Sequence, residues 1–210
     1  MQRWLVSDAP VRQYLRLQWL ALLATVLAMP GARAGDEKGQ YAVRGAALIN
    51  CAMFTQARGG NSETYRVVAS WVDGYITAIN QNVPRTYDVM SFESTELLMA
   101  VLDQHCGKHP RDPVFGVISQ LVAKLEVDRI TAKSDKVSVS VGNRQVLHYA
   151  DLIKRVQQSL GASGFYKGAA SGQYSTQTAD AMKRYQKSVK LEPTGFPDQT
   201  TLWRLLRKEE

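Results

Sequence analysis

The sequence lacks most of the patterns that mark catalytic and membrane proteins. It holds only two cysteines and three histidines among 210 residues. It has no zinc-protease motif, nucleophile elbow or phosphate-binding glycine loop, and its carboxylates are scattered without a spacing that pairs them. Beyond residue 34, no apolar run is long enough to span a bilayer. We therefore expect no enzyme activity, no cofactor, no metal site and no stable membrane span in the exported chain.

Residues 1–34 have the pattern of a secretory signal peptide. Arg3, Arg12 and Arg16 supply positive charge, an apolar stretch from Leu17 to Met29 follows, and Ala32 to Ala34 form a small-x-small cleavage pattern. The apolar stretch is short for a bilayer span. An uncleaved N-terminal anchor is the alternative. On either interpretation the rest of the chain is exported, so we expect a periplasmic location.

The excess of basic residues lies at the C-terminal end. The net charge of +7 falls to +4 without residues 1–34, because those residues hold four Arg and one Asp. All of the remaining excess lies in residues 145–210. No dense Lys/Arg stripe with interleaved aromatics is present, so we expect no nucleic-acid partner. A weakly basic segment suits an acidic polymer such as a cell wall.

Cys51 and Cys106 form an even pair, which in an exported chain predicts a disulfide. The alternative is a reactive cysteine beside His105 or His109, which an oxidising compartment disfavours. The two histidines also have a spacing that places two imidazoles on one helix face for a metal. The glycine between them and the proline after them predict that the helix ends there, so we interpret both as surface residues.

Residues 40–130 have apolar residues at helical spacing, which predicts four helices. Asp112 is the predicted N-terminal cap of the fourth, with Pro113 at its first helical position. The predicted helices cover Tyr41–Ala57, Asn61 or Ser62 to Asn82, Ser94 or Thr95 to Gly107, and Asp112–Leu125.

Trp71, Gly74 and Tyr75 have two interpretations. They could line a groove for a partner, or the aromatic rings could pack in the core while Gly74 allows close helix approach. We favour packing.

The central segment carries the patterns Cys51-x-x-Phe54, Trp71-x-x-Gly74-Tyr75 and Cys106-x-x-His109-Pro110. In these it resembles the small periplasmic helical proteins of the HdeA kind. It is also similar to the Tai-type immunity proteins, which neutralise injected cell-wall amidases. The resemblance implies a disulfide-stapled helical domain in the periplasm and assigns a functional role to no residue.

Residues 131–145 are polar and charged, which predicts a linker. Val137, Val139 and Val141 alternate with serines, so a short strand is the alternative, with a turn at Gly142-Asn143.

Residues 146–208 predict three helices joined by glycine-containing turns. The first covers Tyr149–Leu160, and Ser175 and Asp198 are the predicted caps of the second and third. The sequence Val156–Leu160 is similar to Tyr185–Val189, which two similar helical units around a pseudo-dyad would explain. Their glutamines, Gln157 and Gln186, are interpreted as hydrogen-bond partners of loop backbone, the alternative to the ligand contact that the resemblance described below implies for Gln186.

The order of these turns and helices resembles the peptidoglycan-binding-like domain found at the ends of many wall hydrolases. The resemblance implies a three-helix fold that binds wall glycan or stem peptide. Tyr174 is favoured for direct contact, because an aromatic ring beside a turn can stack on a sugar. The ligand-binding residues that the resemblance implies are Gly172, Tyr174, Thr178, Tyr185, Gln186, Thr194 and Gly195.

Together these patterns predict an all-α protein, with a disulfide-stapled four-helix periplasmic bundle followed by a three-helix peptidoglycan-binding-like domain. The predicted function is non-catalytic binding of peptidoglycan by the C-terminal domain, while the helical domain is presented to a periplasmic protein. The alternatives are an immunity-type inhibitor of a cell-wall hydrolase or an acid-stress chaperone. A wall hydrolase is the least favoured.

Overall fold

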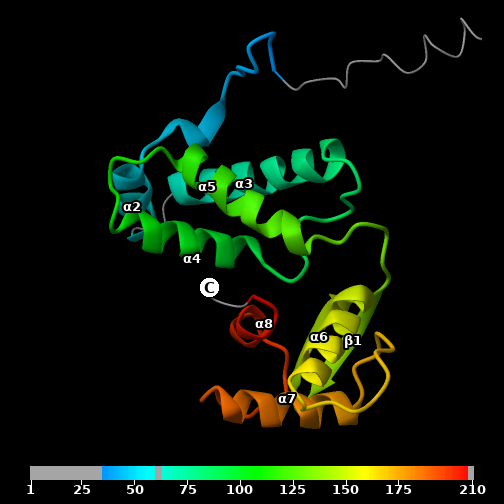
Figure 1. The fold of residues 1–210 in the computed structure, drawn as a ribbon. Helices are drawn as coiled ribbons and strands as arrows, with labels where there is room; N and C mark the ends of the chain where they lie inside the picture. The colour runs from blue at the N-terminus through cyan, green and yellow to red at the C-terminus, as the bar shows by residue number, and fades with distance from the viewer. Residues whose placement is uncertain (1–34, 60–62, 208–210) are drawn as a thin grey trace, which may run out of the picture. The chain divides into compact units, whose positions relative to one another are not determined.

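The computed structural model describes residues 35–59 and 63–207 (Figure 1). The predicted signal peptide lies outside the described residues. The chain divides into two compact units, residues 1–42 and 43–210, and the helices and strands given below lie in the second. In the described ranges, no helix has the length and apolar character that crossing a bilayer requires. The predicted domain limits within residues 40–208 stay a prediction.

The four helices predicted for the central segment are present, and they surround one apolar core (Figure 1). Their inward faces carry residues such as Val72, Leu102 and Ile118, which are fully buried at the helical spacing that the sequence shows. Ser94 caps the third helix, because its hydroxyl accepts a hydrogen bond from the Leu97 backbone N–H at 3.2 Å. The helices are α2 (Cys51–Gly59), α3 (Glu63–Asn82), α4 (Thr95–Cys106) and α5 (Val114–Leu125).

The predicted start of the first helix is wrong. Before α2 the structure has only a short 3₁₀ helix, η2 (Gly45–Leu48). Arg44 is extended and Gly45 has φ +79°, a conformation that interrupts an α-helix. A Cβ on Gly45 would lie 3.2 Å from Cδ1 of the Trp71 ring, a tight contact that this ring could accommodate only by shifting.

The predicted cap of α5 is also wrong. Pro113 occupies the cap position without a side-chain hydrogen bond, and its backbone pairs with Asn50 in an isolated β-bridge. The Asp112 carboxylate instead forms a hydrogen bond with Nε2 of His105 at 2.8 Å. The rings of His105 and His109 stack with centroids 4.6 Å apart. Residues 35–59 and 63–207 contain no group of three side chains that could hold a metal ion.

Trp71 and Tyr75 pack as predicted, but Gly74 does not mediate a close helix contact. The two rings stack with centroids 5.3 Å apart, and both lie against the core of the bundle. Phe115 meets them edge-on at 6.2 and 5.9 Å. Gly74 is exposed, and a Cβ there would meet nothing within 4 Å.

The predicted disulfide is confirmed. Cys51 at the start of α2 bonds to Cys106 at the end of α4, with Cα atoms 4.7 Å apart. Both residues belong to the buried core. The bond therefore links two helix ends that are 55 residues apart in sequence.

Residues 136–149 form a β-hairpin, so the strand alternative for the predicted linker is confirmed. Strand β1 (Lys136–Val141) pairs antiparallel with β2 (Arg144–Tyr149), and Gly142 and Asn143 make the turn. Val139 is fully buried. This two-stranded sheet is a small addition to the predicted all-α class, which the helices confirm.

The C-terminal segment has the three predicted helices around a second core. They are α6 (Ala150–Ala162), α7 (Thr176–Ser188) and α8 (Gln199–Leu206). Both predicted caps are confirmed: the Ser175 hydroxyl accepts from the Thr178 N–H at 3.3 Å, and the Asp198 carboxylate accepts from the Thr201 N–H at 2.9 Å. The buried core contains Leu152, Val156, Leu160, Tyr166, Ala181, Met182, Tyr185, Leu202 and Leu205, with Phe92 from the segment before α4.

Candidate functional site

Two buried glutamines hold the loops of the C-terminal segment. Gln157 on α6 accepts a hydrogen bond from the Gly172 N–H at 3.0 Å, and its Nε2 donates to the Gln173 carbonyl at 2.9 Å. Gln186 on α7 makes the same two contacts: it accepts from the Gly195 N–H at 2.7 Å, and its Nε2 donates to the Phe196 carbonyl at 3.0 Å. The two side chains are 1% and 0% exposed. The interpretation that these glutamines bond loop backbone is confirmed.

The residues around each glutamine contact repeat with the same spacing. After each loop glycine, the helix cap follows at the third position and a buried threonine at the sixth. The threonine hydroxyl accepts a second hydrogen bond from the glutamine Nε2, at 3.2 Å in the first unit and 3.1 Å in the second. The first unit is Gly172, Ser175 and Thr178, and the second is Gly195, Asp198 and Thr201. This spacing was readable from the sequence, and it extends the predicted duplication well beyond the five residues around each glutamine.

Glycine is required at both loop positions. Gly172 has φ +81° and Gly195 has φ +73°. A Cβ would lie 3.0 Å from the Ala150 carbonyl oxygen in the first unit and 2.9 Å from the Ala179 carbonyl oxygen in the second. Each loop therefore passes so close to a helix that no larger residue fits without a shift.

Most of the predicted ligand-binding residues are enclosed by the fold. Gly172, Thr178, Tyr185, Gln186 and Gly195 are buried, whereas Tyr174 and Thr194 keep partial exposure. The Tyr174 hydroxyl donates to the Gly195 carbonyl at 2.7 Å, and burial raises the pKa of this hydroxyl well above its ordinary value. The structure thus gives six of these residues a role in shaping the loops, whereas Tyr185 packs in the apolar core. Contact of any of the seven with ligand stays a prediction.

Replacing Gln186 with leucine is expected to cost roughly 3 kcal/mol of unfolding free energy. The change keeps the side-chain volume but leaves the Gly195 N–H and the Phe196 carbonyl without their partner, and each orphaned buried group costs about 1–3 kcal/mol. Urea unfolding measures the loss. Lys187→Leu is the control, because this neighbouring side chain is exposed and we expect a change within about 0.5 kcal/mol. Equal losses for both variants would contradict the role of the Gln186 contact.

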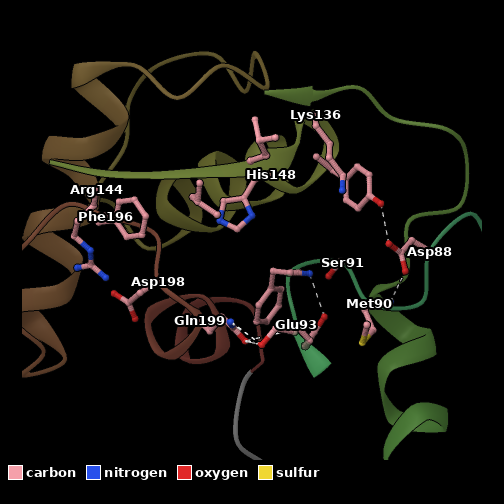
Figure 2. A pocket seen from close by; sticks show the side chains of 15 residues that line it. Asp88, Met90, Ser91, Glu93, Lys136, Arg144, His148, Phe196, Asp198 and Gln199 are labelled. Atoms are coloured by element: carbon pink, nitrogen blue, oxygen red, sulfur yellow. Dashed lines mark hydrogen bonds between the residues drawn. The ribbon is translucent and has the colours of Figure 1, made fainter. Parts of the chain in front are cut away.

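A cleft of about 440 Å³ lies beside the second of these loops (Figure 2). One wall is the hairpin of β1 and β2, another is the segment 88–94 before α4, and the third is the loop that enters α8. Figure 2 shows side chains from all three walls pointing toward the cleft. It is lined by Asp88, Met90, Ser91, Phe92, Glu93, Ser94, Lys136, Arg144, Val146, Leu147, His148, Tyr149, Phe196, Asp198 and Gln199.

Hydrogen bonds join the walls of the cleft. The Tyr149 hydroxyl donates to the Asp88 carboxylate at 2.8 Å, and Gln199 Nε2 donates to the Ser94 hydroxyl at 3.0 Å (Figure 2). His148 is buried in the hairpin wall, with Nε2 3.4 Å from the Pro197 carbonyl. Burial lowers the pKa of His148; the contact with the carbonyl opposes this change and the nearby ammonium of Lys136 adds to it. His148 is therefore neutral at pH 7.

The sequence predicted none of the cleft residues as functional. Arg144 and Lys136 fell in the predicted linker, where a charged residue usually means solvent exposure. The sequence around Arg144 and Lys136 does not indicate that residues 88–94 lie opposite them in the fold.

Residues 150–205 match the family model described as "Putative peptidoglycan binding domain". The match spans α6, α7 and α8 with both glutamine contacts, and it confirms the predicted peptidoglycan-binding-like domain. This part of the chain is thus similar to a peptidoglycan-binding domain. Searches of the curated proteins and of the solved structures found no match. The resemblance of residues 40–130 to the HdeA kind and to Tai-type proteins stays a prediction.

Proposed function

We propose that this is an exported, non-catalytic protein that binds peptidoglycan through residues 146–208 and presents its helical bundle in the periplasm. The observation that carries the proposal is the family match over residues 150–205. The match coincides with three helices packed around one buried core, to which Phe92 from the segment before α4 also belongs. A binding unit of this kind determines where a protein is held and leaves its further role to the rest of the chain.

Two further observations support this location. The buried Cys51–Cys106 disulfide suits an oxidising compartment outside the cytoplasm. The positive charge of the exported chain is concentrated in residues 145–210, which suits an anionic wall polymer.

The proposal is tested by sedimentation of the purified protein with isolated sacculi. We expect the protein in the pellet, and in the supernatant once the sacculi have been digested with a muramidase. We also expect no release of muropeptides by the protein itself, because the proposed role is binding. Protein that stays in the supernatant with intact sacculi would overturn the proposed function, and release of muropeptides would overturn its non-catalytic part.

A second role for the bundle is favoured by its aromatic cluster, Trp71, Tyr75 and Phe115. The three rings are only half-buried, although they pack against the core. Aromatic residues are enriched in protein–protein interfaces relative to the rest of the protein surface. This observation favours a protein partner for the bundle, either a wall hydrolase that it inhibits or unfolded clients in acid. A periplasmic crosslinking screen at neutral and low pH distinguishes the two, because only client binding should depend on acid.

A further inference from the structure

We propose that the helical bundle and the C-terminal domain (α6, α7 and α8) form one cooperative unit, joined through residues 88–94. The sequence places a predicted linker between them, which would leave two domains free to move independently. In the structure both lie within the single compact unit of residues 43–210, and residues 88–94 of the bundle contribute side chains to the C-terminal domain. The inference goes beyond the proposed function, because it does not depend on what either domain binds.

Phe92 completes the apolar core of the C-terminal domain. It is 7% exposed, and it belongs to the same buried cluster as Leu152, Met182 and Leu202, which come from α6, α7 and α8. The ring itself comes from the segment that leads into α4, a helix of the bundle. A core that loses such a ring is left with a cavity, which is strongly destabilising. The C-terminal domain therefore depends on the bundle for part of its core.

Trp203 on α8 makes the corresponding contact in the other direction. Its side chain is partly buried, and it packs against both apolar clusters, that of the bundle and that of the C-terminal domain. The Arg207 guanidinium lies over its ring at 4.9 Å and over the Phe92 ring at 5.6 Å. Because one tryptophan touches both cores, moving α8 away from the bundle would expose apolar surface on both sides.

Hydrogen bonds connect the start of α4 with α6 and α8. Gln199, the first residue of α8, donates to the Ser94 hydroxyl at 3.0 Å and accepts from the Ser94 N–H at 3.2 Å. Ser94 is the residue that caps α4. Arg155 on α6 donates to the Ser91 hydroxyl at 3.0 Å and also to the Asp128 carbonyl. The two domains thus share the hydrogen bonds of these helix ends, which separation would break.

A buried ion pair lies at the same boundary. Glu93 of the bundle, whose side chain is 0% exposed, is paired with Arg207, which follows α8. Arg207 also lies 3.2 Å from the carboxylate of Asp128 in η3 (Glu126–Asp128), the short 3₁₀ helix after α5. A buried charge is costly when its partner is removed, so this pair opposes separation of the two domains.

One kind of arginine contact recurs from helix to helix and crosses the domain boundary. On each of α6, α7 and α8, an arginine donates to a backbone carbonyl that follows the preceding helix. The pairs are Arg155 with Asp128, Arg184 with Phe165, and Arg204 with Val189. The contact that attaches α6 to the end of the bundle is therefore of the same kind as those that attach α7 to α6 and α8 to α7.

Domains joined in this way are thermodynamically linked. If the C-terminal domain unfolds, the bundle loses its contacts with Trp203 and the counter-charge of Glu93, and if the bundle unfolds, the C-terminal domain loses Phe92. A substitution in the core of either domain should therefore destabilise both. By the same linkage, a ligand that binds only the folded C-terminal domain should also protect the bundle.

The test measures amide hydrogen exchange of the full protein by mass spectrometry. It compares the protection of the slowest amides in α3 and α5 with that in α6 and α7. Met182→Ala removes a fully buried side chain from the C-terminal core, and Ile118→Ala does the same in the core of the bundle. Val127→Ala is the control, because this apolar side chain of η3 is 85% exposed. Circular dichroism checks that each variant is folded.

We expect Met182→Ala to lower the protection of the slowest amides by roughly thirtyfold or more in both domains, although the substitution lies in only one. Ile118→Ala should likewise act on both domains, and Val127→Ala should stay within about twofold of the unchanged protein in each. A loss of protection that is confined to the domain carrying the substitution would overturn the inference.

Phe92→Ala tests whether residues 88–94 make the connection. Without this ring, the C-terminal domain loses both a core residue and part of its link, whereas the bundle keeps its own core. Protection in α6 and α7 should then fall at least about tenfold more than in α3 and α5. An equal fall in the two domains would show that other contacts connect them and would overturn the role assigned to this ring.

Sedimentation with sacculi separates this inference from the proposed function. If the unchanged protein does not sediment but Met182→Ala acts on both domains, the inference stands and the proposed function fails. If the protein sediments and Met182→Ala acts on the C-terminal domain alone, the proposed function stands and the inference is wrong. If the protein does not sediment and the effect of Met182→Ala is confined to one domain, both are wrong.

Discussion

Replacing Arg207 with alanine is expected to destabilise the protein by about 3–5 kcal/mol, the usual cost of removing one partner from a buried ion pair. Arg207 follows α8 and pairs with the Glu93 carboxylate, and it also lies 3.2 Å from Asp128. The two side chains of the main pair are 13% and 0% exposed. Without the guanidinium, the Glu93 carboxylate would remain buried, and among the described residues only the Phe92 N–H would donate to it.

Urea unfolding, followed by circular dichroism, measures this effect. Arg204→Ala is the matched control, because it removes an exposed arginine near the end of the same helix and should cost less than about 1 kcal/mol. A double variant, Arg207→Met with Glu93→Met, should recover much of the loss, because it removes both charges together. A cost below about 1 kcal/mol for Arg207→Ala, or no recovery in the double variant, would contradict the buried pair.

Removing the disulfide is expected to cost about 4 kcal/mol, the loop-closure value for a separation of 55 residues. The bond connects the start of α2 to the end of α4, so without it the unfolded chain gains freedom over most of the bundle. Alanine at both Cys51 and Cys106 is the suitable change, since both positions are buried and apolar.

The measurement is the unfolding free energy in urea, with and without dithiothreitol. The reductant should destabilise the unchanged protein by about as much as the double alanine variant is destabilised. It should have no effect on the variant, which therefore serves as the control for the reductant. A variant as stable as the unchanged protein would show that the packed helices alone determine the stability of the bundle.

Helix positions were predictable where a neighbouring side chain determines them. Ser94, Ser175 and Asp198 each cap a helix by accepting a hydrogen bond from the backbone N–H three residues later. This contact depends only on neighbouring residues, so the local sequence predicts it. The buried faces of the helices were predictable for a similar reason, because a helical period of apolar residues leaves one face to pack. The two glutamine contacts were also predictable from the sequence, because the glycine, cap and threonine around each glutamine recur with the same spacing.

Predictions failed where a distant residue competes with the local pattern. The region before α2 has a helical pattern, but Gly45 lies against Trp71 from α3 and adopts a positive φ. Asp112 lies two residues before the start of α5, where a capping carboxylate is expected. Its carboxylate instead forms a hydrogen bond with His105 on α4. In both cases a contact across the fold replaces the local one, and a single sequence does not show which distant group is near.

The amino-acid sequence by itself determined the helical class, the cysteine pair and the peptidoglycan-binding pattern, because each depends on spacings along the chain. Only the tertiary structure decided the cleft. Its walls come from residues 88–94, 136–149 and 196–199, and hydrogen bonds such as that from Tyr149 to Asp88 join them across the fold. Arg144 and Asp198 are both charged residues in the sequence. The fold engages both oxygens of Asp198 with Thr201 and places the guanidinium of Arg144 over the ring of Phe196.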